Sequence, residues 1–140
     1  LCFISSIAAI GQVSDEKITE ETEWNPEIDK TPYSYSKYGS EMEVWRASQE
    51  GVPVIIVNPG IIIGNNLNNS QIQKIVKNKI NFCTSGVSGF VTVEDVVKVT
   101  MRLMEEKVIN ERFILVSENI PFKDFVNYIS AKNKNKKRNV

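Results

Sequence analysis

The fold class is decided by residues 53–60, which read Pro-Val-Ile-Ile-Val-Asn-Pro-Gly. Residues 54–57, between the prolines, form a short, continuous run in which every side chain is apolar and β-branched. Such a run is typical of a strand that is buried on both faces, as strands of parallel sheets are. Proline lacks a backbone N–H, so Pro53 and Pro59 mark the limits of the run. We therefore predict a strand over residues 54–57 in the interior of a parallel sheet.

A helix and another strand are predicted before this run. Residues 34–50 carry apolar side chains at helical spacing, and Gly51 and Pro53 are suited to end the helix. The stripe expected to face the core consists of Tyr38, Met42, Trp45 and either Ala47 or Ser48. Leu1–Ile4 predicts a buried strand. Strand, helix and strand together make a βαβ unit with parallel strands and a right-handed crossover, in which ligands bind at the carboxyl ends of the strands.

Residues 61–140 contain a looser series of further elements. Residues 61–64 are apolar, and a short helix is predicted over 71–79. Thr92 is suited to cap a helix that ends near Glu105, with a core-facing stripe of Val93, Val97, Met101 and Met104. A strand is predicted over 113–116. Pro121 is suited to the first position of a last helix, whose apolar residues are Phe122, Phe125, Val126 and Ile129.

The composition excludes several classes of function. The 140 residues include 17 Lys and Arg, 17 Asp and Glu, and no His, which removes His-based metal sites and Ser-His-Asp triads. Balanced charge creates no field that attracts nucleic acid or a membrane, and no apolar stretch reaches the roughly 20 residues of a membrane helix. Cys2 and Cys83 are expected to be reduced thiols, although the sequence also permits a disulfide. We expect a cytoplasmic protein with no nucleic-acid or membrane partner and no metal.

Three segments have a second interpretation. Residues 1–10 are apolar like the core of a signal peptide, but no basic residue precedes them, which favours a core strand whose beginning is cut off. The acidic residues of the long polar segment 11–32 are interpreted as a solvated loop rather than a metal site. The basic residues of 132–138 are interpreted as a solvated helix end, because no aromatic residue interleaves with them.

Three side chains have the types and spacing that proton transfer requires. Tyr33 and Lys37 are four residues apart, so they share one face of a helix. A free phenol loses its proton only near about pH 10, and an ammonium group beside it stabilises the phenolate. Ser6 follows the first strand, where its hydroxyl can hold the oxygen that Tyr33 protonates. The same spacing recurs at Tyr128 and Lys132, but no serine-terminated strand precedes it, so coincidence is the interpretation there.

Four segments match family motifs in the order of the chain. Residues 5–11 resemble Ser-Ser-x-x-x-x-Gly, with Ser6 at the catalytic serine, and Tyr33 and Lys37 match Tyr-x-x-x-Lys. Residues 59–64 resemble Pro-Gly-x-x-Tyr-Gly, and residues 89–97 resemble a segment with Phe-Val-x-Val-x-Asp-Val. These motifs resemble those of the extended short-chain dehydrogenase/reductase family, also called the NAD-dependent epimerase/dehydratase family. The serine segment and the helix around 41–46 are most similar to the dihydroflavonol-reductase and aldehyde-reductase branch.

The resemblance implies an α/β fold and a nicotinamide cofactor. The chain would form the C-terminal part of a Rossmann-type doubly wound parallel sheet, plus part of a smaller substrate-binding lobe. Residues 1–60 would be the second half of the dinucleotide-binding domain, and residues 61–140 the remaining elements and the substrate-binding lobe, truncated. The cofactor is NAD or NADP, which the sequence does not distinguish. The residues implied to bind it are Tyr33, Lys37, Pro59, Gly60, Ile61 and Ile62.

The chain departs from the family pattern at three points. Asn58 stands where the family usually has Arg, and Ile63 where it usually has Tyr before Gly64. The family's Gly-x-x-Gly-x-x-Gly phosphate loop is not among these 140 residues. We therefore expect residues 1–140 alone to bind NAD(P) poorly, to be inactive, and to expose apolar sheet and helix surface.

Three functions are compatible with these motifs. The first is an NAD(P)-dependent reductase of a small-molecule carbonyl, with catalytic residues Ser6, Tyr33 and Lys37. The second is an epimerase or dehydratase of the same fold that acts on a sugar nucleotide. The third is a non-catalytic protein that senses NAD(P), which the presence of all three side chains disfavours. In proteins that this one resembles, helices like 34–50 often form the face of a homodimer.

Overall fold

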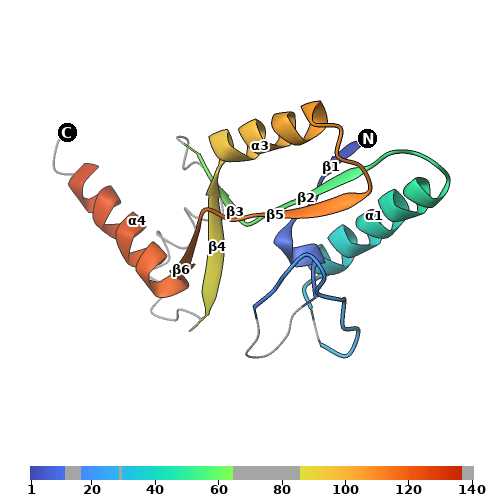
Figure 1. The fold of residues 1–140 in the computed structure, drawn as a ribbon. Coiled ribbons are helices and arrows are strands. Elements are labelled where there is room, and N and C mark those ends of the chain that lie inside the picture. Colours follow the sequence, from blue (N-terminus) through green and yellow to red (C-terminus); the bar gives the residue numbers. More distant parts are fainter. Residues whose placement is uncertain (12–16, 29, 65–85, 137–140) are drawn as a thin grey trace.

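The computed structural model describes residues 1–11, 17–28, 30–64 and 86–136 (Figure 1). A parallel sheet lies between two helices, with the strand order β1 (Cys2–Ile4), β2 (Ile55–Pro59) and β5 (Glu111–Leu115). β2 occupies the middle, and every residue from Val54 to Pro59 is buried. The predicted central strand and its parallel pairing with the first strand are confirmed.

The first strand is more exposed than predicted. Leu1 and Ile4 have exposed fractions of 62% and 40%. Within the described residues β1 pairs with β2 alone, and a strand at the edge of a sheet is covered less than one in its interior. The predicted strand is therefore confirmed over Cys2–Ile4, but its predicted burial is wrong. Cys2 is a free thiol whose partial burial raises its pKa, whereas Cys83 lies outside the described residues.

Helix α1 (Pro32–Gln49) covers one face of this sheet. It begins at Pro32 instead of Ser34 because Thr31 caps it, accepting a hydrogen bond from the N–H of Ser34 at 3.2 Å. The residues it buries are Glu41 and Val44, so the predicted stripe is displaced by one position and Met42 is exposed. Val44 packs into an apolar cluster with Phe3, Trp45, Val54 and Ile56.

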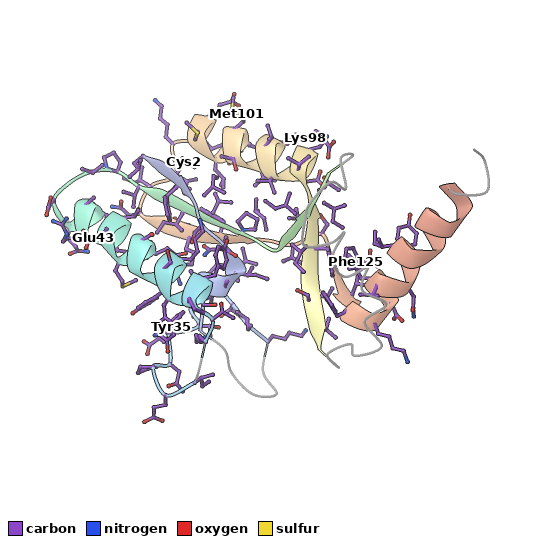
Figure 2. The ribbon with its side chains drawn as sticks, turned by 180° about the vertical axis from the view of Figure 1, so that it is seen from behind. Cys2, Tyr35, Glu43, Lys98, Met101 and Phe125 are labelled. Carbon is purple, nitrogen blue, oxygen red and sulfur yellow. The ribbon has the colours of Figure 1, made fainter. Side chains whose placement is uncertain are left out.

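Helix α3 (Val93–Glu105) covers the opposite face, where Leu103 packs against Ile55 and Val57 (Figure 1). Its predicted cap is confirmed, since the Thr92 hydroxyl accepts a hydrogen bond from the N–H of Asp95 at 3.1 Å. Its predicted core stripe is wrong. Each of the four residues predicted to face the core is between 41% and 56% exposed: Val93, Val97, Met101 and Met104. Figure 2 shows Met101 on the side of α3 that faces away from the sheet.

A second, mixed sheet follows directly from β2. Its strands are β3 (Ile61–Ile63), β4 (Val87–Thr92) and β6 (Glu118–Pro121), in that order, with β3 parallel and β6 antiparallel to β4. Helix α4 (Phe122–Lys136) packs on it through a cluster of Phe90, Phe125 and Ile129. The predicted apolar residues Phe125 and Ile129 are thus confirmed as core. Pro121 ends β6, so the helix starts one residue later than predicted.

Two glycines allow the chain to pass from one sheet to the other. A Cβ atom on Gly60 would lie 2.4 Å from the carbonyl oxygen of Gly89. A Cβ atom on Gly89 would lie 2.5 Å from a methyl carbon of Val116. Only a residue without a side chain permits so close an approach. Gly60 therefore fixes the point at which the carboxyl end of β2 turns into β3.

A loop segment closes the outer edge of β5. The Glu20 carboxylate accepts a hydrogen bond from the N–H of Ile114 at 3.0 Å. The backbone carbonyl of Glu20 accepts a second hydrogen bond, from Nη1 of Arg112 at 3.4 Å. The loop thus occupies one main-chain donor at the edge of β5 and also binds the side chain of Arg112.

Three further predictions concern the helix over 71–79, the division into domains and membrane-spanning helices. The helix predicted over 71–79 lies outside the described residues. The division of the chain after residue 60 stays a prediction, and both β5 and α3, which follow it, belong to the layers of the parallel sheet. None of the helices in the described part of the chain is long and apolar enough to cross a membrane.

Candidate active site

Tyr33 and Lys37 lie in the first turns of α1, one turn apart on the same face of the helix. We call this pair the Tyr33–Lys37 row. The Tyr33 side chain is 56% exposed. Lys37 is partly buried, and its Nζ donates a hydrogen bond to the backbone carbonyl of Ile4 at 3.4 Å. The same ammonium lies 5.6 Å from the ring centroid of Phe3. The row is therefore held against the carboxyl end of β1, with the phenol accessible.

Ser6 lies at this same end of β1. Its hydroxyl accepts a hydrogen bond from the N–H of Ala8 at 3.2 Å and so caps the short helix η1 (Ile7–Ala9). The neighbouring Ser5 is turned inward: its N–H donates to the carbonyl of Val57 at 2.7 Å. Its hydroxyl is buried, with no partner among the described residues. Of the two serines, Ser6 is thus the more accessible, as its predicted role requires.

The predicted cofactor-binding residues of 59–62 follow on the adjacent strand. Pro59 ends β2 and is buried, and the N–H of Gly60 donates to the carbonyl of Leu115 at 3.0 Å. Ile61 and Ile62 belong to β3, and Ile62 is 40% exposed. The structure thus brings Ser6, Lys37 and Pro59 to the same end of the parallel sheet. Ile61 and Ile62 lead away from that end into the second sheet.

Two buried polar residues and one partly buried arginine lie beneath this end of the sheet, and the sequence did not reveal them as a group. Glu41 and Asn58 are 0% exposed. Glu41 accepts hydrogen bonds from Asn58 Nδ2 at 2.5 Å and from Arg112 Nη2 at 2.7 Å. Two signals pointed to them: Asn58 departs from the family pattern, and Glu41 continues the i, i+4 row of Tyr33 and Lys37.

An aromatic contact holds the loop of residues 17–28 against the start of α1. The ring of Trp24 stacks on Tyr38 with centroids 4.3 Å apart and meets Tyr35 edge-on at 5.5 Å. Figure 2 labels Tyr35 near the N-terminal end of the helix. The ammonium of Lys30 lies 4.3 Å from the Trp24 ring centroid, and partial burial lowers the pKa of Lys30. The loop is therefore held against the side of α1 that carries Tyr35 and Tyr38.

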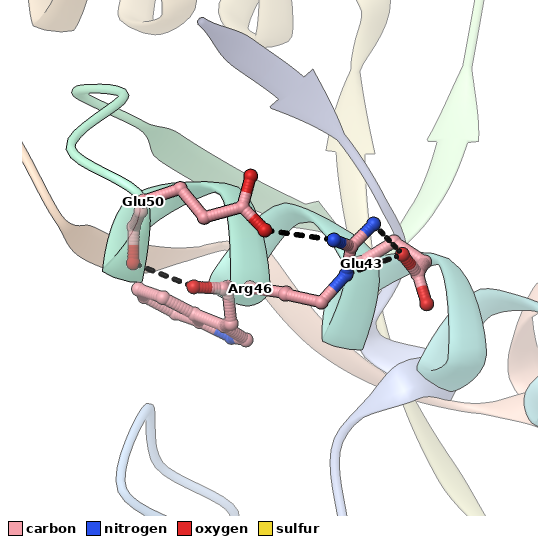
Figure 3. A network of polar contacts seen from close by, with 5 residues as sticks. Glu43, Arg46 and Glu50 are labelled. Atoms are coloured by element: carbon pink, nitrogen blue, oxygen red, sulfur yellow. Dashed lines mark hydrogen bonds and ion pairs between the residues drawn. The ribbon is translucent and has the colours of Figure 1, made fainter.

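The most evident ion pairs of α1 lie away from this site. Figure 3 shows Arg46 between Glu43 and Glu50, with nitrogen–oxygen distances of 2.7 and 2.8 Å. The hydrogen bonds that Arg46 donates to the Glu43 carboxylate raise the pKa of Arg46. All three side chains are more than 60% exposed, so solvent screens them and they contribute little to stability. No cluster of acidic or sulfur side chains in the described part of the chain is arranged to hold a metal ion.

Comparison with known proteins agrees with this architecture. A family model described as "Male sterility protein" (NAD_binding_4) matches residues 2–126. A putative dihydroflavonol 4-reductase from Synechocystis sp. is 39% identical over 64 residues, which are 44% of this chain and 18% of that protein.

Two solved structures share the fold over most of the chain. The structure of gox2253 has a TM-score of 0.78 at 30% identity, over 93% of this chain and 42% of that one. PA4631, a nucleoside-diphosphate-sugar epimerase from Pseudomonas aeruginosa, has a TM-score of 0.77 at 18% identity, over 91% of this chain and 44% of that one. The chain spans less than half the length of these relatives. The predicted Rossmann-type α/β fold is confirmed, and the chain belongs to the NAD-binding male sterility protein family, within the extended short-chain dehydrogenase/reductases.

Proposed function

We propose that this protein is an NAD(P)-dependent oxidoreductase that reduces a small-molecule carbonyl, with Tyr33 as the proton donor. The observation that carries the proposal is the contact of Lys37 Nζ with the carbonyl of Ile4. This contact holds the Tyr33–Lys37 row at the strand end that leads into Ser6. The similarity to a putative dihydroflavonol 4-reductase supports reduction of a carbonyl as the reaction.

The donor groups present fit the nicotinamide half of the cofactor. An exposed phenol and an ammonium group at the carboxyl ends of parallel strands suit the hydroxyls of a ribose. Tyr33 and Lys37 would therefore hold the ribose, and the backbone of residues 59–62 would lie beside the nicotinamide. Bound NAD(P)H would supply the hydride that reaches the carbonyl carbon. The sequence carries no Gly-x-x-Gly-x-x-Gly loop for the phosphates, so these residues account for one half of the cofactor only.

The side chains divide the proton chemistry between them. Ser6 donates a hydrogen bond to the carbonyl oxygen of the substrate and orients it. Tyr33 transfers its hydroxyl proton to that oxygen as the carbon is reduced, which yields an alcohol and a phenolate. The ammonium of Lys37 stabilises the phenolate, and the exposure of Tyr33 lets solvent return the proton. Each group thus acts where charge develops during the reaction.

The test is turnover by the full-length protein with Tyr33→Phe beside wild type. NADH and NADPH oxidation is followed against a panel of aldehydes and ketones. Loss of the phenol hydroxyl is expected to lower kcat by about 10²–10⁴-fold. Tyr35→Phe is the matched control, because Tyr35 lies on the same helix, is 47% exposed and keeps its ring contact with Trp24 in the variant. Its kcat is expected to stay unchanged.

Three results would overturn the proposal. Equal turnover by Tyr33→Phe and wild type would remove Tyr33 from the reaction. Turnover of a sugar nucleotide but of no simple carbonyl, with nicotinamide that stays bound through purification, would assign the protein to the epimerases and dehydratases. Binding of NAD(P) without turnover of either substrate class would favour a sensor.

A further inference from the structure

The side chain of Asn58 joins the serine segment to the helix that carries Tyr33 and Lys37. Its Nδ2 donates one hydrogen bond to the backbone carbonyl of Ser6, at 2.9 Å, and another to Oε1 of Glu41, at 2.5 Å. An amide nitrogen has two hydrogens, so both are used. The orientation of the amide is fixed by chemistry, because both partners are acceptors and would repel the amide oxygen. One buried group thus links the end of β1, the end of β2 and α1.

Glu41 is on the same helix as Tyr33 and Lys37, so its hydrogen bond with Asn58 also holds that helix. It lies four residues after Lys37 and eight after Tyr33, on the same face of α1. Its carboxylate is fully buried, and its second oxygen receives Nη2 of Arg112 at 2.7 Å. A buried carboxylate is stable only with such partners. Any rotation or sliding of α1 would break these contacts, so Glu41 fixes the position of the row relative to the sheet.

Arg112 supplies the positive charge from the neighbouring strand. It lies on β5 opposite Ile56 of β2. Asn58 lies opposite the residue two positions further along β5. Its side chain is 15% exposed, and its guanidinium carbon lies 5.8 Å from the ring centroid of Trp45. Since β5 provides the cation, position 58 need not carry the Arg usual in the family. A neutral amide can occupy it and reach Ser6.

We propose that Asn58, held by Glu41 and Arg112, is a positioning residue that fixes Ser6 relative to Tyr33 and Lys37. The inference rests on the proposed function, because it assigns a purpose to the bridge in that reaction. Asn58 touches neither substrate nor cofactor. It acts through the backbone carbonyl of Ser6, whose hydroxyl orients the substrate, and through Glu41, whose helix carries the proton donor.

The bridge itself is tested without turnover. In ¹⁵N-labelled full-length protein, the side-chain amide hydrogens of Asn58 are expected to exchange slowly with solvent, because both are bonded and buried. The side-chain amide of Asn119, which is exposed, serves as the control within the same sample. Glu41→Gln removes the charged acceptor and is expected to speed the exchange of Asn58 alone. Exchange of Asn58 as fast as that of Asn119 in the wild type would overturn the proposal.

The positioning role is tested by kinetics on Asn58→Leu, which removes both donors at similar volume. A displaced Ser6 is expected to lower kcat by about 10- to 100-fold, with the KM of the substrate changed by less than about threefold. Leu103→Ala is the control, because Leu103 is buried on the opposite face of the sheet. At a temperature where both variants are folded, Leu103→Ala is expected to leave kcat unchanged.

A double-mutant cycle separates positioning from general loss of stability. Ser6→Ala is expected to lower kcat strongly in the wild type and much less in the Asn58→Leu background, because the serine is already misplaced there. Asn58→Ala repeats the cycle if Asn58→Leu fails to fold. An equal effect of Ser6→Ala in both backgrounds, or full kcat in Asn58→Leu, would overturn the positioning role. A wild type without turnover would contradict the proposed function instead, and the exchange measurement would then decide the bridge.

Discussion

The ammonium of Lys37 donates a hydrogen bond to the backbone carbonyl of Ile4 at 3.4 Å, although the two residues are 33 positions apart in the chain. Ile4 is the last residue of β1, and Ser6 follows two positions later. The contact therefore ties the row of Tyr33 and Lys37 on α1 to the strand end that carries the candidate serine. Lys37 thus has two contributions to the candidate site: it holds α1 against β1, and it supplies a positive charge.

Lys37→Met removes the hydrogen bond and the charge together, and stability and kinetics report on them by different measurements. Methionine keeps an apolar chain of similar length beside Phe3, so the free energy of unfolding is expected to change by less than about 1 kcal/mol. Removal of the charge is expected to lower kcat by about 10²-fold or more and to weaken cofactor binding. Steady-state kinetics and a calorimetric titration with NADH and NADPH measure both. Unchanged kcat and cofactor affinity would show that the ammonium only anchors the helix.

Gly60→Ala is expected to destabilise the protein by about 1–3 kcal/mol. The new methyl group would lie 2.4 Å from the backbone oxygen of Gly89, which cannot move aside like a flexible side chain. Gly39→Ala is the matched control, because Gly39 lies within α1 and a Cβ atom there meets nothing within 4 Å. It is expected to stabilise the helix by about 0.5–1 kcal/mol. Chemical unfolding of both variants would contradict the argument if their stabilities changed equally.

Arg112→Met is expected to cost about 3–5 kcal/mol, because it leaves the Glu41 carboxylate buried without its cation. Arg46→Met removes an arginine that also pairs with two glutamates, but at the surface, and no measurable change in Tm is expected. The double variant Glu41→Gln with Arg112→Met removes both charges and is expected to recover part of the loss. Thermal unfolding of the four proteins measures these effects, and a double variant less stable than Arg112→Met would contradict them.

Trp24→Ala is expected to release the loop of residues 17–28 from α1. The variant loses the stacking on Tyr38 and the edge contact with Tyr35, each worth about 0.5–1.5 kcal/mol beyond the area buried. Limited trypsin digestion is expected to cleave after Lys30 faster than in the wild type. Lys30→Gln removes that site and is the control. Cleavage at the wild-type rate in Trp24→Ala would show that other contacts hold the loop.

The sequence predicted the elements whose hydrophobic pattern is compatible with only one position in the fold. The run 54–57 is apolar at every position, so it can only be an interior strand, and β2 is confirmed as one. Helix α3 carries apolar residues on two faces, and the pattern alone does not tell which face meets the sheet. The structure buries Val96 and Leu103 and exposes Val97 and Met101.

The polar core could not be predicted in the same way. A glutamate in a helix is expected to face solvent, because burial of a lone charge is unfavourable. Glu41 is buried because Arg112 reaches it from 71 positions away, and periodicity does not report so distant a partner. Ser6 and the Tyr33–Lys37 row lie at the carboxyl end of β1, the end at which parallel strands finish together. Their catalytic roles, and those of Pro59, Gly60, Ile61 and Ile62 toward the cofactor, remain predictions.

The hydrogen bond that the N–H of Ile114 donates to the Glu20 carboxylate also protects one main-chain donor of β5 from pairing with another strand. An open edge strand recruits β-strands of other molecules and is a common origin of aggregation. Here the loop occupies a main-chain donor of β5 with a charged side chain. β1 carries no such cover among the described residues. Of the two sheet edges in the described part of the chain, β5 is therefore the one at which this loop hinders pairing with a strand of another molecule.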